Sequence, residues 1–106
     1  MDYRESFFAL YLNQANKVLC IKKISECGIS STLVDVRIVM QAALLCNASA
    51  IIVAHNHPSG DLKPSSCDIK MTSQIKESAK ILRLTLLDHV ILTSDSYFSF
   101  ADDGMM

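Results

Sequence analysis

Residues 54–68, AHNHPSGDLKPSSCD, gather two histidines, two prolines, a glycine, three serines and two aspartates directly after an apolar stretch. His55 and His57 are two positions apart, so in extended backbone both imidazoles project to the same side. Two such imidazoles can share one metal ion. Zinc in a catalytic site takes three protein ligands and leaves the fourth position to water, so this spacing predicts two ligands and requires a third.

Asp68 is the candidate for the third ligand. Pro58, Gly60 and Pro64 can turn the chain back and bring the first turn of a following helix opposite the histidines. Two neutral imidazoles and one carboxylate leave a zinc site positively charged, which lowers the pKa of its water towards about 7 and suits hydrolysis. Two alternatives stay open: Asp68 closes a capping box begun at Ser65, and the histidines form a surface turn without function.

The loop resembles a known motif. "HNHPSG" followed by "PSSCD" is similar to the H-x-H-x(7)-S-x-x-D motif of the JAMM (JAB/MPN) zinc metalloproteases, in the version found in the RadC family. The segments "LLDH" (86–89) and "YFSFADDG" (97–104) also resemble that family, so the likeness covers essentially the whole chain. Four residues match the motif without a gap: His55, His57, Ser65 and Asp68.

The resemblance implies roles for individual residues. It implies a zinc ion held by His55, His57 and Asp68, and a glutamate on an early strand that acts on the zinc water as a general base. Glu5, in "ESFFALYLN", matches that glutamate. Ser65 would donate a hydrogen bond to the developing oxyanion. Without the resemblance, Glu5 would be interpreted as a solvated strand end.

Three further polar residues have less specific interpretations. His89, within "LLDHVIL", could be a fourth ligand or a partner of a ligand, but its apolar neighbours favour a structural histidine whose hydrogen bonds are satisfied. Asp61, next to Gly60, could orient the loop or a ligand, and is more typical of a plain turn residue. Asp88 is treated in the same way.

The first half of the chain must supply the elements that flank this loop. Residues 5–12 and 17–24 are apolar and partly aromatic, and the polar residues 13–16 between them predict an antiparallel hairpin. Gly28 and the serines at 25, 30 and 31 predict a loop. Asp35 can then cap a helix, whose apolar positions are Val36, Val39, Met40, Ala43 and Leu44.

The second half holds the loop and the elements around it. Residues 50–54 predict a central strand buried on both faces, with His55 at its carboxyl end. Ser65 or Ser66 can cap a second helix that runs to about Leu84. Residues 86–93 and 97–100 predict two more strands.

The resulting order is ββαβαββ in one domain, residues 1–106. It implies an α/β fold of the α+β type with one mixed sheet and a helix packed on each side, in three layers. The resemblance implies the JAB/MPN, cytidine-deaminase-like version of this architecture.

Composition limits the cellular setting. The chain has 106 residues, of which 50% are hydrophobic, and a formal net charge of −1. Its apolar stretches are shorter than the roughly 20 residues of a membrane helix, and the first residues do not read as a secretory signal, so we expect a cytoplasmic protein with no membrane span. The four cysteines lack C-x-x-C spacing, and we expect reduced thiols. No basic face is evident, which disfavours autonomous nucleic-acid binding.

Two functions from different classes remain. The leading one is a zinc-dependent hydrolase that attacks an amide or isopeptide bond in a protein or peptide substrate with zinc-activated water. The alternative is a non-catalytic or DNA-repair-associated interaction module. The RadC family typically carries a helix-hairpin-helix-like region ahead of this domain, and DNA association attributed to that region is not carried over to these residues.

A deaminase is disfavoured, because H-x-E and P-C-x-x-C are absent. The sequence does not predict an oligomeric state.

Overall fold

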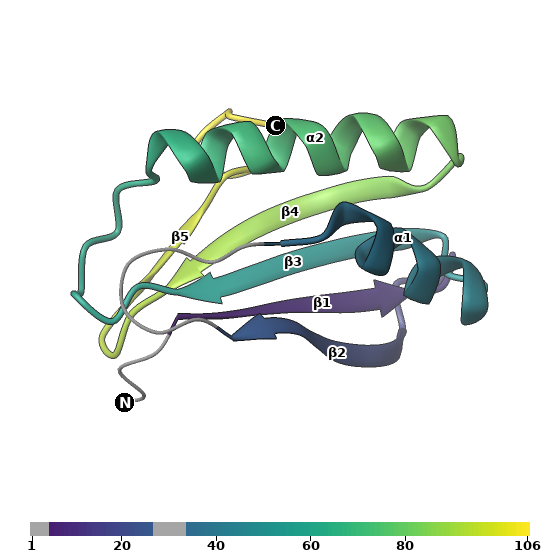
Figure 1. Cartoon of the computed structure of the whole chain (residues 1–106), viewed down its shortest axis with the longest axis horizontal. Helices are drawn as coiled ribbons and strands as arrows, with labels where there is room; N and C mark the ends of the chain where they lie inside the picture. The colour runs from purple at the N-terminus through teal and green to yellow at the C-terminus, as the bar shows by residue number, and fades with distance from the viewer. Residues whose placement is uncertain (1–4, 27–33) are drawn as a thin grey trace.

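The computed structural model describes residues 5–26 and 34–106. Five strands form within these ranges, β1 (Ser6–Leu12), β2 (Val18–Glu26), β3 (Ala50–Asn56), β4 (Thr85–Leu92) and β5 (Tyr97–Ser99). Two helices lie between them, α1 (Val36–Leu45) and α2 (Ser66–Ile81). The order is ββαβαββ (Figure 1), as the sequence predicts.

The strands form one mixed sheet in the order β2-β1-β3-β4-β5. β3 and β4 are parallel, and the other neighbouring pairs are antiparallel. β1 runs against β3 with Phe7 opposite His55. The start of β1 therefore lies beside the end of β3, and this register brings Glu5 to the histidine loop.

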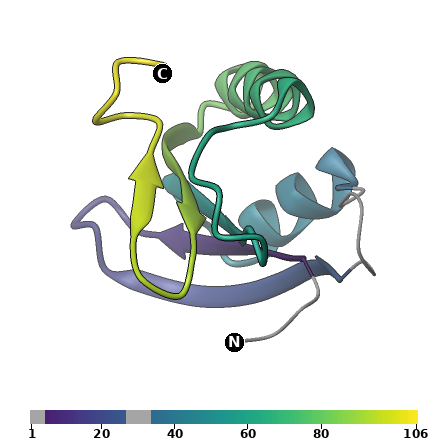
Figure 2. The same cartoon turned by 90° about the vertical axis from the view of Figure 1, so that its left-hand side faces the viewer.

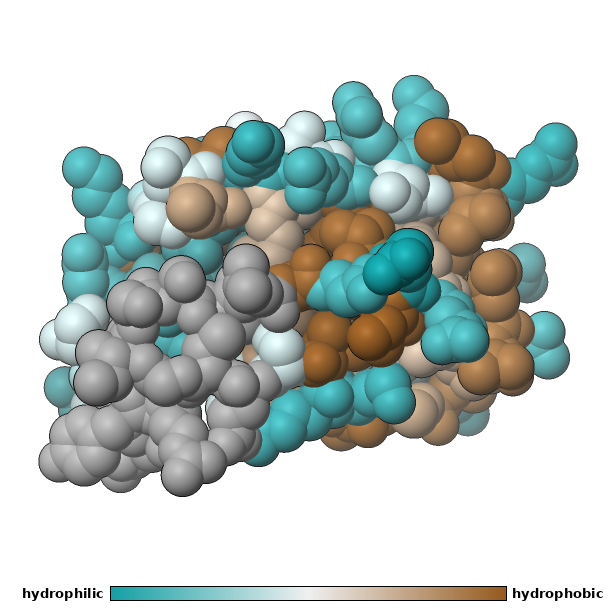
Figure 3. All heavy atoms as spheres, in the orientation of Figure 1, coloured by the Kyte–Doolittle hydropathy of each residue, from teal (hydrophilic) through white to brown (hydrophobic). Residues whose placement is uncertain are grey.

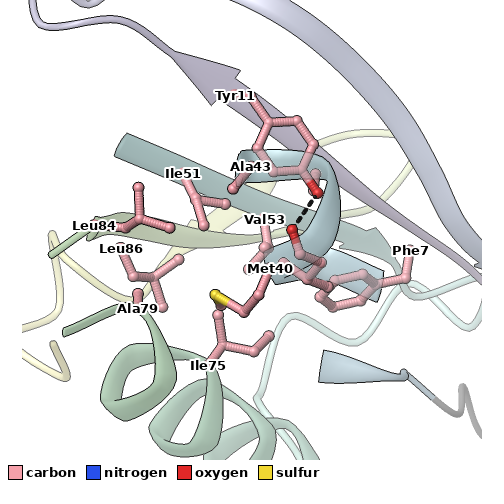
Figure 4. Packing of buried hydrophobic residues seen from close by; sticks show 12 residues of the cluster. Phe7, Tyr11, Met40, Ala43, Ile51, Val53, Ile75, Ala79, Leu84 and Leu86 are labelled. Atoms are coloured by element: carbon pink, nitrogen blue, oxygen red, sulfur yellow. Dashed lines mark hydrogen bonds between the residues drawn. The ribbon is translucent and has the colours of Figure 1, made fainter. Parts of the chain in front are cut away.

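Both helices pack on the same face of the sheet. The side chains of Phe7, Ala9 and Tyr11 on β1 alternate onto one face, and they share a single core with residues of α1 and α2 (Figure 4). Other members of this core are Val39, Met40, Ala43, Ile51, Val53, Ile75, Ala79, Leu84 and Leu86. The sheet curves around the two helices (Figure 2). The structure confirms the predicted mixed sheet with two helices. The prediction of one helix on each side of the sheet is wrong, because both helices pack on the same face.

The boundaries of the helices have local causes. Asp35 caps α1, and its carboxylate accepts the Arg37 backbone N–H at 2.9 Å. α2 ends at Ile81, earlier than the predicted Leu84, because Arg83 adopts a φ of 60° that a right-handed helix does not continue. Ser25 belongs to β2 and not to the predicted loop.

Some expectations fall on other parts of the chain. Gly28, Ser30 and Ser31 lie outside the described residues, and so does Cys27. The three cysteines that the structure describes, Cys20, Cys46 and Cys67, are free. Within residues 5–26 and 34–106, no helix is both long and apolar enough to cross a bilayer.

Exposed apolar side chains gather at one end of the molecule. Apolar side chains are exposed where α1 and α2 finish, among them Leu45 and Ile81, and they form brown surface at the right of the view (Figure 3). The carboxyl end of β3 and the start of α2 lie at the opposite end (Figure 1). The polar loop therefore lies at the end of the molecule away from Leu45 and Ile81.

Candidate metal centre

Three elements bring the candidate residues together. β3 extends through Asn56, two residues beyond its predicted end, so His55 lies within the strand. The side chain of His55 projects to the same face as Ile51 and Val53, underneath the helices. α2 begins directly after the loop, so its first turn, which contains Asp68, comes back over the end of β3.

The two imidazoles and the carboxylate converge on one point. His55 Nε2 lies 2.9 Å from His57 Nε2 and 3.2 Å from Asp68 Oδ1, and His57 Nε2 lies 3.3 Å from Asp68 Oδ2. Two ligand atoms on a tetrahedral zinc ion stand roughly 3.3 Å apart, given bonds of about 2.0–2.1 Å. The spacing of these atoms therefore fits a single ion between them.

Glu5 completes the group from the start of β1. Glu5, His55 and His57 each offer a ligand atom, and these atoms lie within 4.8 Å of one another. These three residues could together hold a metal ion. Ser6, the next residue, donates its backbone N–H to the Asn56 side chain at 2.6 Å, and this hydrogen bond fixes the start of β1 against the end of β3.

The hydrogen bonds of His57 indicate which nitrogen faces the centre. His57 Nδ1 lies 2.7 Å from the backbone oxygen of Asp61. A carbonyl oxygen can only accept, so Nδ1 carries the proton. Neutral His57 then presents an unprotonated Nε2 to His55 and Asp68. An unprotonated nitrogen and a carboxylate oxygen 3.3 Å apart repel one another unless a cation lies between them. These ligand atoms therefore suit a metal ion.

Asp68 has two functions in the structure. Its backbone N–H donates to Ser65 Oγ at 3.0 Å, and its Oδ2 accepts the Ser65 backbone N–H at 2.8 Å. The capping box is therefore present, and the same carboxylate also contacts both histidines. Burial raises the pKa of Asp68, but its contact with His55 and the hydrogen bond from the Ser65 backbone N–H outweigh burial and lower that pKa below its usual range.

His89 is a fully buried neighbour of His55. Its Nε2 lies 2.8 Å from His55 Nδ1, and its Nδ1 contacts the Thr72 hydroxyl. Burial lowers the pKa of His89 to about 3. His89 is both a buried histidine with satisfied hydrogen bonds and a direct partner of a candidate ligand. Sequence reasoning missed Thr72, because no local spacing connects a mid-helix threonine to the loop.

Asp61 and Asp88 hold backbone segments in place. The Asp61 carboxylate accepts the Lys63 N–H at 2.9 Å, as a turn residue does, while its backbone oxygen contacts His57. Asp88 accepts hydrogen bonds from the Ala101 backbone N–H and the Ser99 hydroxyl, and so ties β4 to the segment after it. Within residues 5–26 and 34–106, neither carboxylate forms a hydrogen bond with His55 or Asp68.

Comparison with known proteins adds an independent finding. Residues 1–105 match the family described as "RadC-like JAB domain". A UPF0758 protein of Flavobacterium johnsoniae is 45% identical over 101 residues, which are 95% of this chain and 44% of that protein. A UPF0758 protein of Porphyromonas gingivalis is 44% identical over 104 residues, 97% of this chain and 46% of that protein.

A shorter relative is also similar. The UPF0758 protein YfjY of Escherichia coli K12 is 40% identical over 103 residues, 97% of this chain and 64% of that protein. The chain thus spans about half the length of the first two relatives and less than two thirds of the third. The similarity covers the whole site, from Glu5 to Asp68 and on to His89.

Proposed function

This chain belongs to the RadC-like JAB domain family, and on that premise we propose that it is a zinc-dependent hydrolase that cleaves an amide or isopeptide bond. The family match confirms the resemblance seen in the sequence. The observation that carries the proposal is the convergence of His55 Nε2, His57 Nε2 and the Asp68 carboxylate at 2.9–3.3 Å. A zinc ion held there would activate a water molecule and polarise the substrate carbonyl.

We assign the ligands and the base by position. His55, His57 and Asp68 are the zinc ligands, because their atoms approach one another most closely and all three are largely buried. Glu5 lies at the open side, since it is only partly buried and comes from the start of β1. A carboxylate in that place can take a proton from the attacking water and deliver it to the leaving amine.

Ser65 is the proposed oxyanion donor. Its Oγ already accepts the Asp68 N–H as the helix cap, but a hydroxyl has one proton and two lone pairs. Its own O–H proton is therefore available to a developing oxyanion without loss of the cap. Removal of one such donor lowers kcat by about 10² to 10³-fold in enzymes where it has been measured.

The alternative, a non-catalytic or DNA-repair-associated module, explains less of the site. A binding module does not need imidazoles and carboxylates that converge on one point beside a further glutamate. The net charge of −1 also gives no support to autonomous nucleic-acid binding. Protein or peptide substrates are thus the class that we propose.

Metal content tests the first half of the proposal. Purified protein should contain about one zinc ion per chain by elemental analysis, and His57→Ala should lose it while remaining folded by circular dichroism. Asp61→Ala is the matched control, because it changes the same loop but leaves the backbone oxygen that contacts His57. Folded wild-type protein that takes up no zinc would exclude the hydrolase and favour the module.

Activity tests the second half. Glu5→Gln should keep zinc, since the three proposed ligands are intact, but should lose hydrolysis of a panel of amide-linked and isopeptide-linked peptides. The amide of glutamine is close in shape to the carboxylate and cannot act as a base. Unchanged turnover in Glu5→Gln would remove Glu5 from the mechanism without affecting the metal assignment.

A further inference from the structure

A chain of buried hydrogen bonds runs from α2 to the proposed zinc ligand His55. Thr72 Oγ1 lies 2.7 Å from the backbone oxygen of Asp68, one helical turn earlier, and also contacts His89 Nδ1. His89 Nε2 in turn lies 2.8 Å from His55 Nδ1. Thr72 and His89 are 3% and 0% exposed, so water does not compete for these hydrogen bonds.

The number of protons available in this series of hydrogen bonds determines which group donates in each of them. The Thr72 hydroxyl has one proton, which it donates to the Asp68 backbone oxygen, because that oxygen can only accept. Thr72 Oγ1 must then accept from His89 Nδ1–H. A neutral His89 with its proton on Nδ1 has a bare Nε2, which can only accept from His55 Nδ1–H.

His55 is thereby left with an unprotonated Nε2. His55 Nε2 is the atom that lies close to both His57 Nε2 and the Asp68 carboxylate. A zinc ligand must offer a lone pair, and the nitrogen that offers it is set by the hydrogen bond of the other ring nitrogen. The opposite proton order would place a hydrogen on His55 Nε2, where the ion would have to bind.

We propose that Thr72 and His89 are positioning residues, which fix the tautomer of His55 so that Nε2 is free to bind the metal. The proposal rests on the metal site described under the proposed function. It assigns a role to a buried threonine and a buried histidine that lie behind the proposed ligand His55.

Packing around His89 supports this role. The His89 ring stacks on Phe100 with a centroid distance of 4.5 Å and an interplanar angle of 7°. The edge of Phe7 approaches it at 5.8 Å. A ring held between two aromatic side chains cannot rotate to exchange its nitrogens without disturbing the core, so the partner of each nitrogen stays the same.

The test compares Thr72→Val with Thr72→Ser. Valine has nearly the shape of threonine but neither donates nor accepts, whereas serine keeps the hydroxyl. ¹⁵N NMR of the metal-free proteins at about pH 8, above the ordinary pKa of histidine, reports the protonated nitrogen of each ring. Wild type and Thr72→Ser should show His55 and His89 protonated on Nδ1, and Thr72→Val should shift both to Nε2.

Zinc affinity is the second measurement, made by competition with a chelator. Thr72→Val should bind zinc about 10- to 100-fold more weakly than wild type, as is typical when the hydrogen bonds that orient a metal ligand are disturbed. Thr72→Ser should match wild type within about threefold. A general loss of packing would weaken binding without changing the tautomers.

The outcomes separate this proposal from the zinc assignment. Unchanged tautomers and unchanged affinity in Thr72→Val would overturn the proposal while zinc binding stands. Wild-type protein with His89 protonated on Nε2 would also overturn it. If wild type binds no zinc, the proposed function fails, and the ¹⁵N spectra of Thr72→Val still decide whether Thr72 sets the proton order.

Discussion

The candidate metal centre has an inner half and an outer half that are built differently. The inner half is His55 and Asp68 with their partners Thr72 and His89, all of them buried. The outer half is Glu5 and His57 with the loop that follows β3, and its residues are less deeply buried or exposed. The inner half is held by side-chain hydrogen bonds between β3, α2 and β4. The outer half is held by bonds to backbone atoms and to Asn56.

This difference separates two requirements of a hydrolytic site. Ligands must keep one geometry and one protonation state, and burial among fixed partners provides both. The base and the open side must admit water and substrate, which burial would prevent. Substitutions in the inner half should therefore affect metal binding and stability. Those in the outer half, apart from the proposed ligand His57, should affect turnover or have little effect.

The largest effect should come from Asp68→Ala. It removes a proposed ligand, so zinc affinity should fall by more than the roughly 100-fold that follows loss of a ligand's partner. It also removes one side of the capping box, at a cost of about 1 kcal/mol. Chelator competition and thermal unfolding would measure the two losses separately.

Ser65→Ala is the matched control for that variant. It removes the other side of the same capping box, at a similar cost of about 1 kcal/mol, but the Ser65 backbone N–H still holds Asp68 Oδ2. Zinc affinity should therefore remain close to wild type. Equal loss of zinc in both variants would mean that Asp68 acts through the helix cap and is no ligand.

Sequence and structure agree best where the chemistry is local. His55 and His57 are related by strand alternation, and Asp68 is fixed by a cap three residues after Ser65. Spacing and the turn-forming residues between them therefore make convergence a hypothesis, beside a plain helix cap and a surface turn. The position of Glu5 followed from the family resemblance and not from spacing. It depends on the antiparallel register of β1 and β3, which is set by the whole sheet.

The partners of the inner half could not be predicted in the same way. His89 reaches His55 across 34 residues through the parallel pairing of β3 and β4, and Thr72 reaches His89 across 17 residues. No local pattern encodes these contacts, because they depend on how far α2 lies above the sheet. The side of the sheet on which α1 packs was missed for a similar reason, since an amphipathic helix indicates a buried face but not which face of a curved sheet it covers.

The next effect concerns acid stability and the inner half. The unfolded chain takes up a proton on His89 below about pH 6.5, whereas the folded protein keeps this histidine neutral until its pKa of about 3. The contribution of neutral His89 to the free energy of unfolding is fully present above about pH 6.5, and it is lost as the pH falls towards 3. The loss amounts to about 3 kcal/mol between pH 7 and 4.5.

Urea unfolding of the metal-free protein at both pH values would measure this loss. His89→Gln cannot titrate, so its stability should fall less steeply over the same range, whatever its stability at pH 7. An equally steep fall in His89→Gln would show that other groups cause the acid sensitivity.

A smaller effect is expected in the outer half from Asn56→Ala. This change removes the acceptor for the Ser6 N–H, so the start of β1 loses one hydrogen bond of about 1 kcal/mol. Glu5 should then spend less time at the open side, and kcat should fall about fivefold to tenfold with zinc affinity unchanged. Asn56→Asp keeps an acceptor oxygen and should be closer to wild type. Loss of zinc in Asn56→Ala would mean that the two halves are not independent.

The smallest effect should come from Asp61→Ala. The partner of His57 is the Asp61 backbone oxygen, which every substitution retains, and the lost side chain only accepts the Lys63 N–H within an exposed turn. Zinc affinity should stay within about threefold of wild type, against the 10- to 100-fold loss expected for Thr72→Val. Asp61→Ala and Thr72→Val each remove a side chain that bears oxygen from a residue that contacts a histidine. The difference in zinc affinity between the two variants therefore shows whether each half holds its imidazole through backbone or through side-chain atoms. If Asp61→Ala weakens zinc as much as Thr72→Val, the loop depends on its side chains as the inner half does, and backbone support of His57 would be insufficient.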